Sequence, residues 1–164
     1  MSHPYDAITV LQGAQFVFTP CPGTKQDDLK SSVATLKNAG TNAVISVLSN
    51  TELGMLGVIE LGDEIQQQGM AWYQLPIEDD CAPQAPFFDA FEVVKEELQT
   101  RLQAGETIAI HCRGGSGRTG LMAAILLLEA DEPWETVKTQ IQSIRPKALT
   151  LAPHLEFLQQ YYLD

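Results

Sequence analysis

Apolar residues follow two patterns along this chain. Short continuous runs rich in β-branched and aromatic residues are typical of buried strands, whereas longer segments with apolar residues three or four positions apart are typical of amphipathic helices. The expected strands are FVF at 16–18, NAVISVL at 42–48, MAWYQLPI at 70–77 and TIAIH at 107–111.

The segments between these runs have helical spacing. A helix is expected at 27–40, and a second, broken by its glycines, at 51–69. In the segment 87–105 we expect an amphipathic helix with an inward face made of Phe88, Phe91, Val94, Leu98 and Leu102. Three more helices are expected at 118–130, 133–145 and 152–163. The first of these three is so apolar that we expect it in the core.

Alternating strands and helices indicate the α/β class. We expect a single domain over residues 1–164, with a mainly parallel central sheet of about four or five strands flanked by helices. Candidate ligand sites in such sheets lie beyond the carboxyl ends of the strands.

The composition narrows the range of partners. A net charge of −11 on 164 residues argues against a nucleic-acid binder and against a binder of anionic membranes, because both need a basic surface. The longest apolar run, at 121–128, is too short to span a bilayer, and MSHPYDAITV does not resemble a signal peptide. Three cysteines without a CxxC pair favour a reducing compartment. We therefore expect a cytoplasmic protein. We also expect it to be a monomer.

The sequence HCRGGSGRTG at 111–120 joins an expected strand to an expected buried helix. Glycines at 114, 115 and 117 let successive backbone N–H groups point at one centre, and the helix N-terminus adds further donors. Arg118 can fork onto two oxygens of a tetrahedral oxyanion. The donors that favour a bound anion also favour the thiolate form of Cys112, and Thr119 can donate to the sulfur. The loop therefore predicts phosphoryl transfer to Cys112.

Competing motifs fit this segment less well. A Walker loop needs a glycine and a lysine where this chain has Cys112 and Arg118. A zinc site needs more ligands than His111 and Cys112, whose side chains point to opposite sides of a strand. Sulfur transfer of the rhodanese type, or arsenate chemistry, on the same loop remains an alternative, although five residues between the cysteine and the arginine favour phosphoryl transfer.

The segment HCRGGSGRTG resembles the HC-x5-R-[ST] signature of cysteine-dependent protein tyrosine and dual-specificity phosphatases. PIEDD, TPCPG and VISVLSNTELGMLGV are similar to the kinase-associated, cyclin-dependent-kinase-inhibitor-3-like branch, and the resemblance covers residues 16–162. It implies a protein tyrosine phosphatase-like fold and hydrolysis of phosphotyrosine, with phosphoserine and phosphothreonine as further substrates. It also implies a cysteinyl-phosphate intermediate and neither a metal nor another cofactor.

The resemblance also implies roles for individual residues. Cys112 is the expected nucleophile, Arg118 the phosphate clamp, Thr119 the partner of the thiolate and His111 a brace for the loop. The expected substrate-binding residues, mainly through their backbone amides, are Arg113, Gly114, Gly115, Ser116, Gly117 and Arg118.

A leaving alkoxide or phenolate needs a proton, so an acid is expected on a neighbouring loop. PIEDDC offers two adjacent candidates, Asp79 and Asp80. In the family the acid follows Pro-Ile-x, which favours Asp79 and leaves Asp80 as the alternative acid.

Several points stay open at this stage. A catalytically silent phosphopeptide-binding module is the main alternative to an enzyme. The expected substrate is a phosphorylated protein or a small aryl phosphate, since no lysine lies between Cys112 and Arg118. Cys21 and Cys81 lie near loops that flank the site and could have a redox role. For His154, packing is favoured over activation of water.

Overall fold

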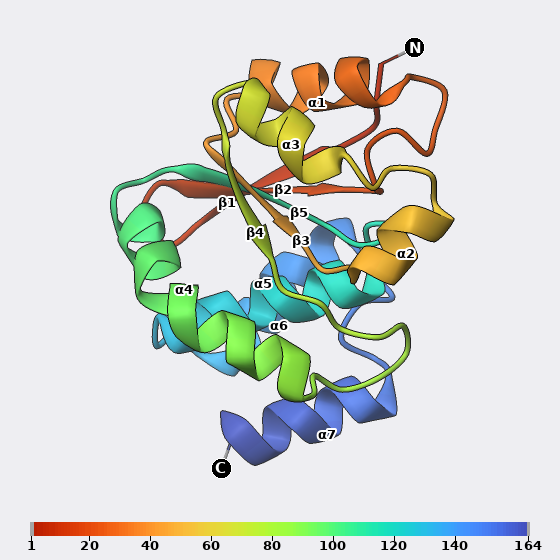
Figure 1. Ribbon diagram of the computed structural model, residues 1–164. Helices are drawn as coiled ribbons and strands as arrows, with labels where there is room; N and C mark the ends of the chain where they lie inside the picture. The colour runs from red at the N-terminus through yellow and green to blue at the C-terminus, as the bar shows by residue number, and fades with distance from the viewer. Residues whose placement is uncertain (1, 164) are drawn as a thin grey trace.

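A five-stranded sheet forms the centre of the computed structural model, which describes residues 2–163 (Figure 1). The strands are β1 (Asp6–Val10), β2 (Ala14–Thr19), β3 (Ala43–Ser46), β4 (Ala71–Gln74) and β5 (Thr107–His111). Their spatial order is β1-β2-β5-β3-β4, and every neighbouring pair is parallel except β1 and β2. The predicted α/β class with a mainly parallel sheet is confirmed.

Strand β5 is the middle strand of the sheet, and all its residues except the first are buried. Ala109 pairs with Val17 of β2 on one side and with Val44 of β3 on the other. The four predicted strands are confirmed: β5 has the predicted bounds, β2 is longer than predicted, and β3 and β4 are shorter. Strand β1 was not predicted, because an exposed edge strand such as DAITV carries little of the apolar signal on which the prediction depended.

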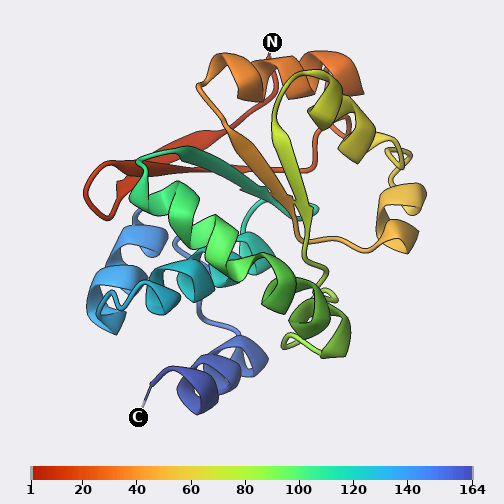
Figure 2. The same cartoon turned by 60° about the vertical axis from the view of Figure 1, so that its left-hand side comes forward.

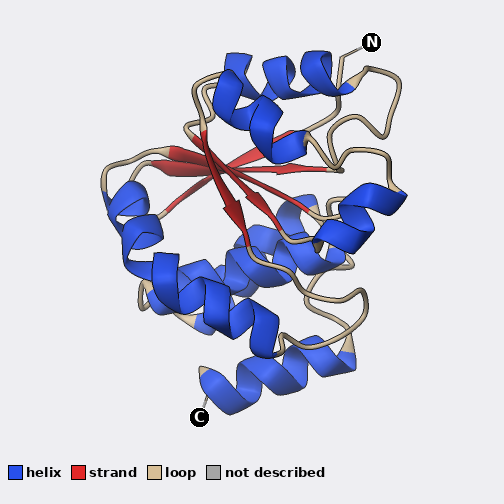
Figure 3. Cartoon of the chain, in the orientation of Figure 1, coloured by secondary structure: helices blue, strands red, loops and turns tan. Residues whose placement is uncertain are grey.

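The helices cover both faces of this sheet (Figure 3). Their bounds are α1 Leu29–Asn38, α2 Asn50–Met55, α3 Leu61–Gln67, α4 Ala85–Gln103, α5 Gly117–Glu129, α6 Trp134–Ile144 and α7 Ala152–Tyr161. Helices α1 and α3 lie on one face and α4, α5 and α6 on the other, while α7 packs outside α4 (Figure 2). Within residues 2–163, no helix is both long and apolar enough to cross a membrane.

Two helices illustrate how the apolar pattern is used. Helix α5 is buried along almost its whole length, as its composition predicts. In α4 the fully buried residues are Phe87, Phe91, Leu98 and Leu102. The expectation for the start of this helix was therefore wrong by one position: Phe87 enters the core, whereas Phe88 is half-buried and packs on Phe157 and Tyr161 of α7.

The four parallel strands end at the same edge of the sheet. Their last residues are Thr19, Ser46, Gln74 and His111, and the pairing places Ser46 beside both His111 and Gln74. The segments that follow these strands, which are far apart in the sequence, therefore meet at one edge. This convergence positions the candidate site.

Candidate active site

The cysteine loop, residues 112–118, connects the end of β5 to the first turn of α5. Three of its carbonyl groups are held from outside: Cys112 O accepts from His111 Nδ1 (3.0 Å), Arg113 O from Cys21 N (2.9 Å) and Gly115 O from Arg145 Nε (2.7 Å). In a trans peptide the following N–H points opposite to the carbonyl. The amides of Arg113, Gly114 and Ser116 are thus turned away from these donors, toward the inside of the loop.

Gly115 is required where this loop approaches β2. Its φ of +83° lies in the left-handed region, and a Cβ there would come within 2.6 Å of the Thr19 carbonyl carbon and oxygen and 2.8 Å of Pro20 N. Backbone atoms cannot move aside as a flexible side chain can. The close approach therefore admits only glycine at this position.

The sulfur of Cys112 lies at the base of the loop and is almost fully buried, with 4% of the residue exposed. It accepts hydrogen bonds from Gly115 N at 3.3 Å and from Thr119 Oγ1 at 3.2 Å. Both donors interact better with an anionic sulfur than with a neutral thiol. The predicted proximity of Cys112 and Thr119 is thus present in the structure.

Arg118 reaches the same region from the first turn of α5 and is 2% exposed. Its Nη1 and Nη2 donate to the two carboxylate oxygens of Glu52 at 2.8 Å each, and Nη1 also donates to Ile77 O at 3.0 Å. Within residues 2–163, the buried Nε has no hydrogen-bond partner. One edge of the guanidinium is therefore fixed by Glu52, and the edge that carries Nε is left for another ligand.

The two candidate acids lie on the loop 76–84 that follows β4. Asp79 Oδ1 is 3.5 Å from Arg118 Nε, and Asp79 lines the same cavity as Cys112. Its side chain is 70% exposed. Asp80 adopts a left-handed φ of +60° and does not line that cavity. The geometry favours Asp79 of the two.

His111 is connected to the sheet by a chain of hydrogen bonds. Because a carbonyl only accepts, His111 Nδ1 donates to Cys112 O, and Nε2 must then accept from Ser46 Oγ at 2.5 Å. Ser46 in turn accepts from Trp72 Nε1 at 2.8 Å. Burial lowers the pKa of His111 to about 4, so the ring is neutral at pH 7. Trp72 is thus a partly buried residue of β4 whose ring N–H supports this chain of hydrogen bonds.

This buried ring predicts a pH dependence of folding. Between pH 6.5 and 4, His111 is protonated in the unfolded chain but stays neutral in the folded chain. The free energy of unfolding should therefore fall as the pH drops through this window, by up to about 3 kcal/mol from this group alone. Urea unfolding at pH 7 and pH 5 measures the change. The His111→Asn variant should lose less stability over this interval than the wild type; an equal loss in both would contradict the assignment.

Arg145, after α6, is a further support of the cysteine loop. Besides its bond to Gly115 O, its Nη1 donates to Asp6 Oδ2 of β1 at 2.7 Å, and its Nη2 donates to Phe18 O of β2 at 3.4 Å. The guanidinium also lies over the Phe18 ring, 5.9 Å from its centroid. Arg145 thus ties the loop to the two strands at one end of the sheet.

Replacing Arg145 with glutamine should loosen the loop without unfolding the protein. We expect the dissociation constant for vanadate, a tetrahedral oxyanion, to rise about tenfold, the value of one charge-assisted hydrogen bond. Vanadate titration together with thermal unfolding measures both effects. Arg101→Gln is the matched control, because Arg101 makes comparable contacts with Glu97 and Glu106 away from the site. Equal vanadate affinity in the two variants would contradict this role.

Three other residues of interest lie around the loop. Cys21 is buried, and its backbone N–H donates to Arg113 O of the cysteine loop. Burial, and to a smaller extent the neighbouring Cys112, raises the pKa of the Cys21 thiol to about 12. Cys81 is half-buried on the loop 76–84. His154 is buried on α7, and burial lowers its pKa against the opposing effects of the Cys81 backbone and of Asp80 and Asp79. His154 therefore packs beneath that loop as a neutral ring.

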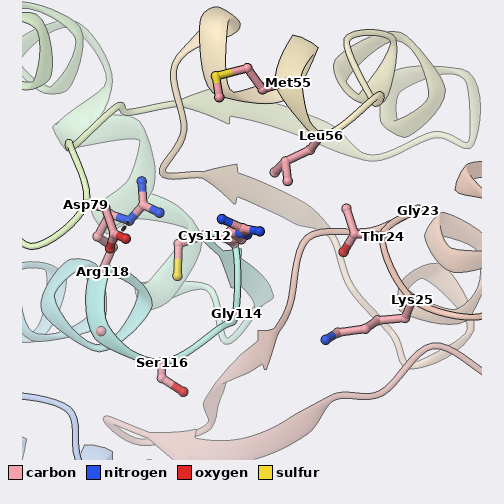
Figure 4. Close-up of a pocket in the computed structure, with 12 residues that line it drawn as sticks. Gly23, Thr24, Lys25, Met55, Leu56, Asp79, Cys112, Gly114, Ser116 and Arg118 are labelled. Carbon is pink, nitrogen blue, oxygen red and sulfur yellow. Dashed lines mark ion pairs between the residues drawn. The ribbon is translucent and has the colours of Figure 1, made fainter.

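A cavity of about 720 Å³ opens over the cysteine loop (Figure 4). Cys112 and Arg118 lie at its base, Asp79 beside them, and Met55 and Leu56 of the α2 region form an apolar wall. Its other lining residues are Gly23, Thr24, Lys25, Arg113, Gly114, Ser116 and Gly117. The structure thus brings the predicted residues Cys112, Arg118, Asp79 and Thr119 together.

Sequence reasoning missed Glu52, Ser46 and Arg145. Each acts by contacting another residue of the site, and no spacing in the sequence reports such a contact. The one available signal was Arg118 itself, because a buried arginine needs a carboxylate partner. Glu52 lies in TELGMLGV, part of the segment that resembles the family, and was a candidate for that partner.

Comparison with known proteins agrees with this geometry. The family model for cyclin-dependent kinase inhibitor 3 (CDKN3) matches residues 5–139. The chain is 28% identical over 162 residues to the PRL-1 phosphatase of Drosophila melanogaster, covering 96% of this chain and 83% of that protein. It is 35% identical over 111 residues to the cyclin-dependent kinase inhibitor 3 of Rattus norvegicus, covering 65% of this chain and 51% of the rat protein. The match thus spans about half the length of that relative.

Solved structures show the same fold. The crystal structure of a kinase associated phosphatase, carrying a serine at its catalytic site cysteine, superimposes with a TM-score of 0.85 at 23% identity, over 98% of this chain and 94% of that chain. Tk-PTP in its active form superimposes with a TM-score of 0.70 at 20% identity, over 94% of each chain. On the family match over residues 5–139, the chain belongs to the cyclin-dependent kinase inhibitor 3 family, the kinase-associated branch of the dual-specificity phosphatases.

Proposed function

We propose that this chain hydrolyses phosphotyrosine in proteins, with phosphoserine and phosphothreonine as further substrates, through a cysteinyl-phosphate intermediate. The observation that carries the proposal is the base of the cavity, where Arg118 lies with Cys112 and Asp79, and where the buried Arg118 Nε makes no hydrogen bond within residues 2–163 and contacts Asp79 Oδ1 only as a 3.5 Å ion pair. The Nε–H is a buried donor without a hydrogen bond, and an oxyanion bound in the cavity can accept that hydrogen bond.

The first step transfers the phosphoryl group to sulfur. Cys112 attacks phosphorus, so that an S–P bond forms while the bond from phosphorus to the tyrosine oxygen breaks. Arg118 and the amides of the cysteine loop stabilise the charge on the phosphoryl oxygens. Asp79 gives its proton to the departing phenolate oxygen.

The second step releases phosphate. A water molecule attacks phosphorus while the Asp79 carboxylate accepts a proton from it, and the S–P bond breaks. The electron pair returns to sulfur, and Thr119 and the Gly115 amide, both already donating to Cys112, stabilise the departing thiolate. Free inorganic phosphate then leaves through the open cavity.

The cavity walls support an aromatic phosphoester. Met55 and Leu56 offer an apolar surface above the cysteine loop, against which the ring of phosphotyrosine can pack. The cysteine loop contains no lysine that would recognise a more highly charged phosphate. A phosphorylated protein or a small aryl phosphate fits both features.

A trapping experiment tests the proposed chemistry. The protein is mixed with a peptide that carries radiolabelled phosphotyrosine, quenched in acid and digested. We expect the label on the fragment that contains Cys112. Binding of the peptide without phosphate release would instead indicate a silent binding module, and formation of thiocyanate from thiosulfate and cyanide would indicate sulfur transfer. Either result contradicts the proposal.

A further inference from the structure

The cavity is larger than a phosphoryl group requires. Its volume of about 720 Å³ lies within the ~300–1,000 Å³ typical of sites that enclose a whole small ligand. Its charged lining residues are Lys25, Arg113, Arg118 and a single carboxylate, Asp79. Arg118 and Asp79 belong to the site already described, and Arg113 has an expected role only through its backbone amide, so the charged side chains of Lys25 and Arg113 have no assigned role.

Lys25 and Arg113 are exposed, and within residues 2–163 neither makes an ion pair or a side-chain hydrogen bond. In a protein with a net charge of −11, two unpaired cations at one cavity are a marked local exception. The long-range field of the protein repels an anionic substrate, so a local positive pair has its greatest effect where the substrate docks.

The backbone that carries Lys25 is firmly held. Cys21 O accepts hydrogen bonds from Thr24 N (3.3 Å) and Thr24 Oγ1 (2.6 Å), which closes the turn 21–24. Gly23 has a φ of +84°, and a Cβ there would lie 2.9 Å from Val58 Cγ1 and 3.3 Å from Leu29 Cα, so the turn is packed against α1. Lys25 thus starts from a fixed point rather than from a loose loop.

The same turn is bonded directly to the cysteine loop. Cys21 N donates to Arg113 O at 2.9 Å, so the segments that carry the two cations are neighbours. Figure 4 shows the Lys25 side chain reaching from its turn toward the part of the cysteine loop that carries Gly114 and Ser116, on the side of the cavity away from Asp79. Lys25 and the acid therefore lie on different sides of the bound phosphoryl group, whereas Arg113 also lines an adjoining pocket together with Asp79.

We propose that Lys25 and Arg113 form a second anion subsite, which selects phosphotyrosine peptides that carry an acidic side chain next to the phosphorylated residue. This inference rests on the proposed function, because the phosphoryl group must occupy the cysteine loop for the neighbouring carboxylate to reach the two cations. The apolar wall holds the ring, Arg118 holds the phosphoryl group and the cationic pair holds the adjacent carboxylate.

The test compares two phosphotyrosine peptides that differ only in glutamate or glutamine at the flanking positions. Their affinities are measured for the Cys112→Ser chain, which cannot turn them over. We expect the glutamate peptide to bind about fivefold more tightly, as for an exposed ion pair, with a preference that declines as salt is raised. Adding Lys25→Gln should reduce this ratio, and adding Arg113→Gln as well should abolish it. Lys30→Gln, an exposed lysine of α1 outside the cavity, should leave the ratio unchanged.

Each outcome is decisive. Equal affinity of the two peptides for the Cys112→Ser chain overturns the subsite and leaves the phosphatase proposal standing. A preference for glutamate that survives the double substitution also overturns it. If neither peptide binds, and the unsubstituted protein releases no phosphate from either, both proposals fall. The glutamine peptide serves as the folding control, because a misfolded variant loses affinity for both peptides.

Discussion

The Cys112→Ser variant is expected to lose phosphatase activity by about 10⁴-fold or more while retaining affinity for phosphopeptides. A serine hydroxyl is a much weaker nucleophile than a thiolate, and the two donors to the sulfur, Gly115 N and Thr119 Oγ1, cannot ionise it. Binding should persist because Arg118, its Glu52 partner and the loop amides are untouched. Initial rates on p-nitrophenyl phosphate and on a phosphotyrosine peptide measure the loss.

The control for this variant is Cys81→Ser. Cys81 is a half-buried free thiol on the neighbouring loop 76–84 and lies outside the cavity that Cys112 lines. Its replacement should leave the rate essentially unchanged. Retained turnover in Cys112→Ser would show that the phosphoryl group goes directly to water, and the covalent mechanism would have to be abandoned.

The Asp79→Asn variant is expected to lose about 10²- to 10³-fold in kcat on phosphotyrosine. Its carboxyl group lines the cavity beside Arg118 Nε, where it can reach the leaving oxygen. The loss should be much smaller on p-nitrophenyl phosphate, because p-nitrophenolate is a stable anion that departs without a proton. The decline of kcat at high pH, which reports the acid in its protonated form, should also disappear from the pH profile.

Asp80→Asn is the matched comparison, since Asp80 is the adjacent carboxylate with the same chemistry. Asp80 has a left-handed backbone and does not line the cavity, so we expect its replacement to leave both the rate and the pH profile nearly unchanged. If Asp80→Asn instead caused the leaving-group-dependent loss, the assignment of the acid would have to be exchanged between the two residues.

The central part of the fold could be predicted from the sequence because its signals are local. TIAIH predicted β5 with its observed bounds, and the apolar run after it predicted the buried helix α5. Strand β1 was not predicted because its residues are mostly exposed. In α4, Phe88 was predicted to face the core in place of Phe87, because two adjacent phenylalanines leave the helical phase uncertain by one position. Both errors occurred where the apolar pattern is weak or ambiguous.

The candidate site divides in the same way. Cys112, Arg118 and Thr119 lie within one short loop, so their spacing predicted that they would meet. Glu52, Ser46 and Arg145 lie on other elements, far from the loop in the sequence. Arg145 Nε donates to Gly115 O, and Glu52 accepts from Arg118, only because the fold brings them together. A single sequence carries no information on such pairings until the order of the strands in the sheet is known.

The contact of Arg145 with the cysteine loop determines how far the chain can be shortened. The family match ends at residue 139, yet Arg145 and the buried His154 follow it. A protein cut at the end of the matched region would keep every residue of the HC-x5-R signature but would leave the Gly115 carbonyl without its donor. We therefore expect that the shortest fragment with the proposed activity includes the segment after α6, although no residue of that segment belongs to the signature.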